Sequence, residues 1–153
     1  MSLEELEAIR QLKYAYFRHL DTKHFTELGA LLTDDVTTAF QSGALSFQGR
    51  EAVVGFLTES LGDPGIITLH NGHHPEIALH DPETASGTWY LEDRVIVPEH
   101  DFEIYGTAIY RDEYVNDGDG WKISHTGYDR IFEEHRRRST GEIVSFTSRF
   151  DPP

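Results

Sequence analysis

Near its amino terminus the chain spaces apolar residues with the period of a helix. Ser2 and Glu5 have the spacing of a capping box, which predicts a helix that begins at Ser2 and runs to about Leu20. On a helical wheel with 100° per residue, Tyr16 falls on the apolar arc and Tyr14 falls outside it. We therefore expect Tyr16 to face the core and Tyr14 to point away from it.

Two further helices are predicted before residue 65. Apolar residues at helical spacing indicate a short helix over residues 25–32, which Asp34 and Asp35 end before a strand over residues 36–40. A third helix is predicted over residues 50–61, followed by Gly62 as a left-handed stop.

From Ile66 onward the pattern changes to strands and turns. The predicted strands cover residues 68–79, 85–97, 104–115 and 121–132. Helices followed by a long antiparallel sheet are typical of an α+β fold, in which the helices pack on one side of a strongly curved sheet whose concave face can enclose a ligand. We expect one domain over residues 1–135 and an extended carboxyl-terminal arm over residues 136–153.

One carboxylate interrupts the apolar face of the second of these strands. Alternation puts Asp93 on the same side as Trp89, Leu91 and Val95, with Arg94 on the opposite side. An unpaired carboxylate in an apolar interior costs several kcal/mol, so Asp93 needs a hydrogen-bonding partner. The histidine cluster just upstream offers candidates, and a polar site inside an apolar cavity is the leading interpretation.

Three of the nine histidines lie within five positions. Alternation puts His70 and His74 on one face and His73 on the other, although Gly72 and Pro75 make a bulge an alternative. A metal site is one interpretation, but the sequence shows no recognised spacing of metal ligands, and we expect no metal. An acid–base role suits His70 better, because a carboxylate partner such as Asp93 could hold its tautomer. The alternative is that these polar residues, Tyr16 included, have ordinary structural roles.

Composition narrows the function further. The chain of 153 residues has 27 acidic against 13 basic residues, a net charge of −14, which opposes binding to nucleic acid or to an anionic membrane. Cysteine is absent, which excludes thiolate nucleophiles and disulfides. The amino terminus lacks the pattern of a signal peptide, and no apolar run approaches the ~20 residues of a membrane span. We expect a cytoplasmic protein whose partner is a small molecule.

Four stretches resemble one known family. These are residues 16–21 (YFRHLD), 70–77 (HNGHHPEI), 84–93 (TASGTWYLED) and 127–135 (GYDRIFEEH). They resemble the bile-acid 7α-dehydratase group, which belongs to the SnoaL-like families of the nuclear transport factor 2-like superfamily. The resemblance spans about residues 9–135, whereas the loop over residues 98–104 is shorter than in that group and the tail after residue 138 is not recognisable.

The resemblance implies a cone-shaped α+β barrel with an apolar pocket and no cofactor or metal, assembled as a homotrimer or homodimer. Its functional residues correspond to Tyr16, Asp21, His70, Asp93 and Arg130. The substrate it implies is small and hydrophobic, with a coenzyme A conjugate as one form. The reaction implied is elimination of water from a hydroxylated enone.

The roles suggested by this resemblance are as follows. His70 would be the general base or acid, oriented by Asp93, and Tyr16 the donor, tuned by Asp21, although these two roles could be exchanged. Arg130 would neutralise negative charge. Competing interpretations are a ketosteroid isomerase or polyketide cyclase, and a noncatalytic subunit that binds a hydrophobic ligand.

Overall fold

Strands of one curved sheet make up most of the protein. The computed structural model describes residues 2–153. Its strands are β1 (Leu32–Ala39), β2 (Ile67–Leu79), β3 (Thr84–Val97), β4 (Phe102–Asn116), β5 (Trp121–Arg137) and β6 (Ile143–Ser148). The strand order is β1-β5-β4-β3-β2, with β6 also paired to β5. All neighbouring strands are antiparallel except β1, which runs parallel to β5.

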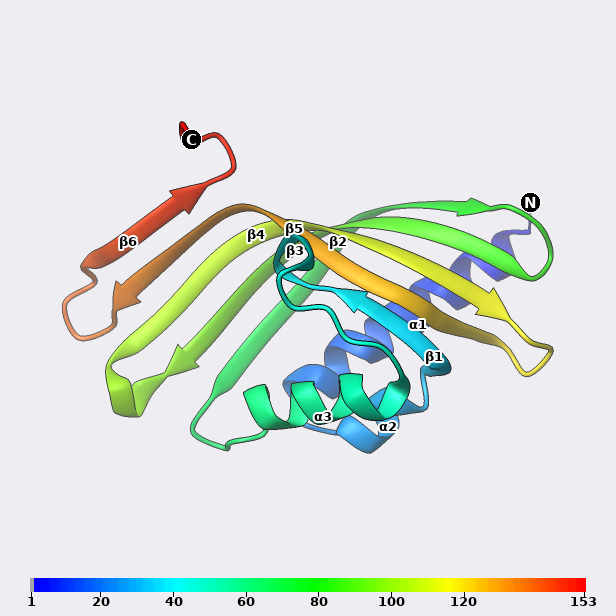
Figure 1. Ribbon diagram of the computed structural model, residues 1–153, viewed down its shortest axis with the longest axis horizontal. Coiled ribbons are helices and arrows are strands. Elements are labelled where there is room, and N and C mark those ends of the chain that lie inside the picture. The colour runs from blue at the N-terminus through cyan, green and yellow to red at the C-terminus, as the bar shows by residue number, and fades with distance from the viewer. Residues whose placement is uncertain (1) are drawn as a thin grey trace.

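The predicted α+β architecture is confirmed. Three helices, α1 (Leu3–Asp21), α2 (Phe25–Gly29) and α3 (Arg50–Leu61), lie below the sheet, which arches over them in Figure 1. Two short 3₁₀ turns cover Gln41–Gly43 (η1) and Pro98–His100 (η2). Within residues 2–153, β1 and β2 do not pair with each other, so the sheet is open rather than a closed barrel.

Helix α1 begins as predicted. The Ser2 hydroxyl accepts a hydrogen bond from the Glu5 backbone N–H at 3.4 Å, which satisfies one of the free donors at the start of the helix. Tyr16 is only 1% exposed and Tyr14 is 42% exposed, as the helical wheel predicts. The side of α1 that carries Tyr16 therefore packs on the sheet.

Three local predictions are wrong. Helix α2 ends at Gly29 rather than at Leu32. Asp34 and Asp35 lie inside β1 instead of preceding it, because pairing with β5 begins as early as Leu32. Gly62 has a right-handed backbone. A β-carbon at this position would lie 2.3 Å from the Thr58 carbonyl oxygen, so close approach, not handedness, explains this glycine.

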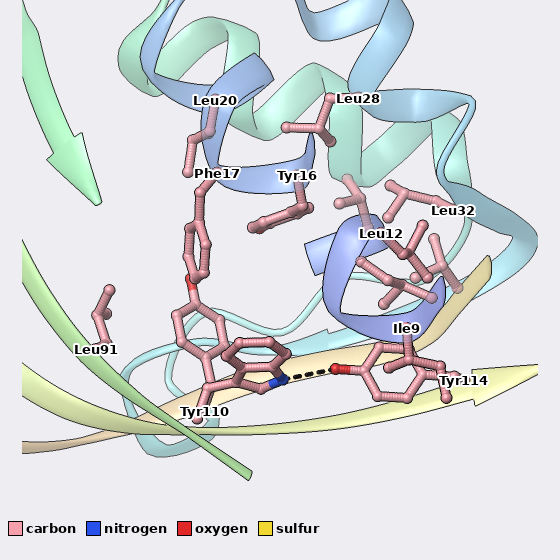
Figure 2. Close-up of a cluster of buried hydrophobic side chains, with 14 of the residues drawn as sticks. Ile9, Leu12, Tyr16, Phe17, Leu20, Leu28, Leu32, Leu91, Tyr110 and Tyr114 are labelled. Atoms are coloured by element: carbon pink, nitrogen blue, oxygen red, sulfur yellow. Dashed lines mark hydrogen bonds between the residues drawn. The ribbon is translucent and has the colours of Figure 1, made fainter. Parts of the chain in front are cut away.

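The core lies between α1 and the concave face of the sheet. Figure 2 shows α1 presenting Tyr16, Phe17 and Leu20 on the side where Tyr110 of β4 and Leu91 of β3 lie. The Phe17 ring reaches β2 because Gly72 has no side chain, since a β-carbon there would lie 2.4 Å from the ring. Burial of each large apolar side chain contributes about 1.5–3 kcal/mol.

The carboxyl-terminal segment adds a strand to the sheet. Strand β5 continues to Arg137, past residue 135, and β6 then pairs with residues 132–136 of β5. Beyond β6, the Arg149 guanidinium donates hydrogen bonds to the backbone carbonyls of Arg130 (2.9 Å) and Asp129 (3.2 Å). The end of the chain is therefore attached to the middle of β5. Among residues 2–153, no helix combines the length and the apolar character needed to cross a bilayer.

Candidate active site

A cavity of about 170 Å³ lies between the helices and the concave face of the sheet. Four of the five residues predicted for the site line it, namely Tyr16, His70, Asp93 and Arg130. Asp21 does not line the cavity but contacts one of these four directly. The rest of the lining is mostly apolar and comes from α1, the segment around η1, α3, β3, β4 and β5; it consists of Leu20, Phe40, Gln41, Leu45, Phe56, Leu57, Ser60, Leu61, Val95, Ile104, Tyr110, Tyr128 and Glu133.

His70 is held by Asp21. The His70 Nδ1 atom lies 2.7 Å from Asp21 Oδ1, and the His70 backbone N–H donates to Asp21 Oδ2 at 2.9 Å. Thr68 adds a third hydrogen bond to the same carboxylate at 2.9 Å. Asp21 is the last residue of α1, where the helix dipole disfavours a negative charge, so these three donors offset an unfavourable position.

This contact determines the tautomer of His70. A carboxylate only accepts hydrogen bonds, so the neutral imidazole carries its proton on Nδ1 and leaves the lone pair of Nε2 free. The Phe17 ring stacks on the imidazole at a centroid distance of 6.4 Å and an interplanar angle of 10°. His70 is thus oriented on two sides, with a basic nitrogen available for chemistry.

The prediction that Asp93 orients His70 is wrong. These residues are neighbours across β2 and β3, but the Asp93 carboxylate is bound by both terminal nitrogens of Arg130. One of these hydrogen bonds, from Nη2 to Oδ2, measures 2.9 Å. A two-pronged guanidinium contact to a buried carboxylate is stronger than one imidazole contact. The hypothesis that Asp21 tunes Tyr16 is also wrong, because within residues 2–153 the Asp21 carboxylate accepts its hydrogen bonds from Thr68 and His70.

A glycine makes the Asp93–Arg130 contact possible. Arg130 belongs to β5 and Asp93 to β3, so the guanidinium must cross β4. It crosses at Gly106, the residue opposite Asp93, where a β-carbon would lie 2.8 Å from Arg130 Nη1. Burial alone would lower the pKa of Arg130, but the hydrogen bonds and charge of Asp93 outweigh it and raise that pKa above its usual value. The Arg130 guanidinium therefore stays charged.

Tyr16 lines the cavity, and its phenol is buried. Within residues 2–153 its hydroxyl has no hydrogen-bond partner of normal geometry, although it is buried. Burial, and then the charge of Asp112, raise the pKa of Tyr16. Burial likewise raises the pKa of Tyr110 well above its usual value. Both phenols therefore keep their protons at neutral pH and can donate hydrogen bonds to an oxygen in the cavity.

Sequence reasoning missed a buried ion pair behind these phenols. Lys13 Nζ lies 2.7 Å from Asp112 Oδ2, and both side chains are fully buried. The ammonium lies 3.8 Å from the ring centroid of Tyr110 and 4.5 Å from that of Tyr16. The signal was available, because Lys13 comes one turn after the buried Ile9.

Glu133 was also missed. Its side chain lines the cavity beside Arg130, with Oε2 at 3.8 Å from Arg130 Nε and Oε1 at 3.1 Å from His135 Nε2. Simple alternation would place Glu133 and Arg130 on opposite faces of β5. A bulge between β4 and β5, where the register shifts after Thr107, brings them to the same face.

The other two clustered histidines lie outside the site. The expected bulge occurs between His73 and Glu76, and His74 has a left-handed backbone with φ of 50°. His74 is exposed and its ring lies near Tyr90, on the opposite face of the sheet from Asp93, so the predicted common face for His70 and His74 is wrong. Among residues 2–153, no three His, Asp or Glu side chains form a group that could hold a metal ion.

Comparison with known proteins matches this architecture to a family. Residues 1–141 match the SnoaL-like domain. The chain belongs to the SnoaL-like family. Among solved structures, this SnoaL-like protein is similar to a provisionally assigned scytalone dehydratase from Novosphingobium aromaticivorans, with 20% identity and a TM-score of 0.80 over 99% of this chain and 96% of that one.

Two other solved structures show the same fold. One is the hexachlorocyclohexane dehydrochlorinase LinA-type3 from Novosphingobium barchaimii, with 18% identity and a TM-score of 0.73 over 99% of this chain and 97% of that one. The other, from Novosphingobium aromaticivorans, is an NTF2-like protein with a cystatin-like fold, with 19% identity and a TM-score of 0.70 over 84% of this chain and 83% of that one. At these identities the likeness establishes the fold.

Proposed function

We propose that this SnoaL-like protein is a cofactor-independent lyase that eliminates water from a hydroxylated enone. The observation that carries the proposal is one cavity lined by both His70, whose Nδ1 is held by Asp21, and Tyr16, whose buried hydroxyl has no hydrogen-bond partner within residues 2–153. A base and a donor in an apolar cavity are the two groups that such an elimination needs. Two of the similar structures carry names of eliminations, one of water and one of hydrogen chloride.

Each group has a defined step. His70 Nε2 removes the acidic proton from the carbon next to the conjugated carbonyl, and Tyr16 donates a hydrogen bond to the carbonyl oxygen as negative charge develops on it. The electron pair of the broken C–H bond is first delocalised onto the carbonyl oxygen as an enolate. It then forms the new double bond as the C–O bond breaks and its electron pair leaves on the hydroxide. The imidazolium returns its proton to the departing hydroxide, which leaves as water. No electrons enter or leave, so the reaction needs no redox partner.

Asp93 and Arg130 act in this scheme as positioning residues. Both terminal nitrogens of Arg130 are occupied by Asp93, and within residues 2–153 only Nε of the guanidinium lacks a hydrogen-bond partner. The pair forms part of the cavity wall. A guanidinium has five N–H groups and Asp93 takes two of them, so direct neutralisation of substrate charge would use the three that remain.

The substrate we propose is a ring-containing hydroxylated enone of the steroid or polyketide kind, the class suggested by the resemblance to the bile-acid 7α-dehydratase group. A coenzyme A conjugate of such a molecule is one form to test. The enclosed volume of about 170 Å³ is below the ~300–1,000 Å³ of sites that enclose a whole drug-sized ligand. A multi-ring substrate would therefore place only its reacting end inside.

The test is incubation with a panel of hydroxylated enones, followed by mass spectrometry. We expect loss of one water from at least one of them. Since a positioned proton transfer contributes about 10²–10⁴-fold, His70→Ala should lower kcat by at least about 10²-fold, and Asp21→Asn should lower it in the same direction because the tautomer is no longer held. The matched control is His73→Ala, which removes an exposed imidazole from the same strand and should leave kcat unchanged.

Three results would contradict the proposal. Product of unchanged mass would indicate an isomerase, which shares the enolate but keeps the hydroxyl. No turnover anywhere in the panel, with a folded protein that still binds these compounds, would favour the noncatalytic interpretation. Wild-type turnover by the His70→Ala variant would refute the assigned base.

A further inference from the structure

The charges around the cavity do not balance. Asp93 and Arg130 neutralise each other through two hydrogen bonds. Glu133 is a second carboxylate on the cavity wall, and Arg130 has only a long contact of 3.8 Å left for it. The acidic and basic side chains that line the cavity, Asp93, Glu133 and Arg130, therefore carry one excess negative charge. The negative charge of the whole chain, −14, acts in the same direction.

The remaining contact of Glu133, with His135, neutralises the charge of its carboxylate only weakly. His135 Nε2 lies 3.1 Å away, but the His135 side chain is 35% exposed, so water and salt screen its interaction. The Glu133 side chain is 20% exposed, against 4% for Asp93, which places it at the wetter side of the site. A ligand that enters the cavity thus comes close to a carboxylate that no cation among residues 2–153 binds tightly.

We propose that Glu133 is a specificity residue that excludes anionic groups from the cavity, so that the part of the substrate held there is an uncharged, oxygenated ring. This inference rests on the proposed function for the identity of the site and goes beyond it in naming the charge class. Two negative charges about 6 Å apart, at an effective dielectric constant of about 20, repel each other enough to weaken binding by roughly 100-fold. A ring ketone or alcohol avoids this repulsion, whereas a free carboxylate or phosphate does not.

The test compares two ligands of nearly the same shape. The probes are 2-acetylnaphthalene, which is neutral, and 2-naphthoate, which is an anion at neutral pH, with Kd measured by isothermal titration calorimetry. We expect the wild-type protein to bind the ketone at least about 30-fold more tightly. Glu133→Gln should reduce this ratio at least about 10-fold, mainly by tightening the binding of naphthoate. The matched control is Glu113→Gln, which removes an exposed charge from the opposite face of the sheet and should leave the ratio within about twofold.

Each outcome either supports or overturns the proposed role of Glu133. An unchanged ratio in Glu133→Gln, equal affinity of the wild-type protein for both probes, or no binding of either probe would overturn the inference. Because the measurement is binding, it is independent of turnover. A His70→Ala variant that keeps the selectivity while the wild-type protein turns over none of the enones would refute the proposed reaction and leave the role of Glu133 standing. Turnover of an enone by the wild-type protein, together with an unchanged affinity ratio in Glu133→Gln, would support the proposed reaction and refute the role of Glu133.

Discussion

Replacing Lys13 by methionine removes one half of a fully buried ion pair and leaves Asp112 charged in the core. The ammonium contributes a contact of 2.7 Å to that carboxylate and lies 3.8 Å from the ring centroid of Tyr110. Breaking a buried pair by removing one partner costs about 3–5 kcal/mol, because the remaining charge has no partner. This is a large part of the ~5–15 kcal/mol that stabilises a typical domain.

The double variant Lys13→Met with Asp112→Asn distinguishes the cost of an unpaired buried charge from the cost of lost packing. Asparagine keeps an acceptor for the Tyr114 hydroxyl, which donates to Asp112 at 2.8 Å. Both buried charges are then absent, so their desolvation no longer has to be offset. We expect the double variant to lose less than about 2 kcal/mol, mostly from the lost contact of the ammonium with the aromatic rings.

Urea unfolding followed by tryptophan fluorescence measures these differences. Trp89 is a suitable reporter because it is fully buried and donates a hydrogen bond to Tyr114. For a chain of this length, 3–5 kcal/mol corresponds to a fall in Tm of roughly 6–20 °C. A loss below about 1 kcal/mol in Lys13→Met, or a double variant as unstable as the two single variants added together, would refute the reasoning.

Two further predictions follow from close contacts and from the buried phenols. Gly106→Ala should destabilise the fold by about 1–3 kcal/mol and lower activity, because the new methyl group would displace the Arg130 guanidinium; wild-type stability in urea would contradict this. Stability should also fall as pH rises above about 10. The folded state raises the pKa of Tyr16 and Tyr110, so the unfolded chain releases these protons first, at up to about 1.4 kcal/mol per pH unit for each phenol. Urea unfolding between about pH 8 and pH 11 measures how the free energy of unfolding depends on pH. We expect it to fall less steeply with pH in Tyr110→Phe. A free energy of unfolding that does not change above about pH 10 would contradict the prediction.

Local patterns were enough to predict most of the fold. The capping box at Ser2 located the start of α1, and alternation in β3 correctly placed Asp93 among buried apolar residues. Elements whose limits depend on distant pairing were harder to predict. Asp34 and Asp35 read as a break in the sequence, yet β1 pairs with β5 on both sides of them, at Leu32 and again from Thr37, with a register shift between the two. Pairing with a strand almost 90 residues away cannot be predicted from the neighbouring residues of the sequence.

In the candidate site, too, local patterns predicted some features and contacts between distant residues decided the others. The sequence identified residues that needed polar partners, but it could not say which partner each would take. Asp93 meets Arg130 because Gly106 opens a path across β4, and Asp21 meets His70 because α1 ends against β2. Glu133 escaped notice because a bulge changes which side chains of β5 share a face. Lys13 and Asp112 could have been found, since each interrupts an apolar face in the same manner as Asp93.

The attachment of the chain end to β5 makes the tail part of the site's support. Arg149 binds the carbonyl groups of Asp129 and Arg130, and β6 pairs with the stretch that contains Glu133. The segment after residue 138 is thus joined to the strand that carries two of the charged cavity residues. A change in the tail would therefore act on Arg130 and Glu133 through the backbone of β5, with no change in any residue that lines the cavity.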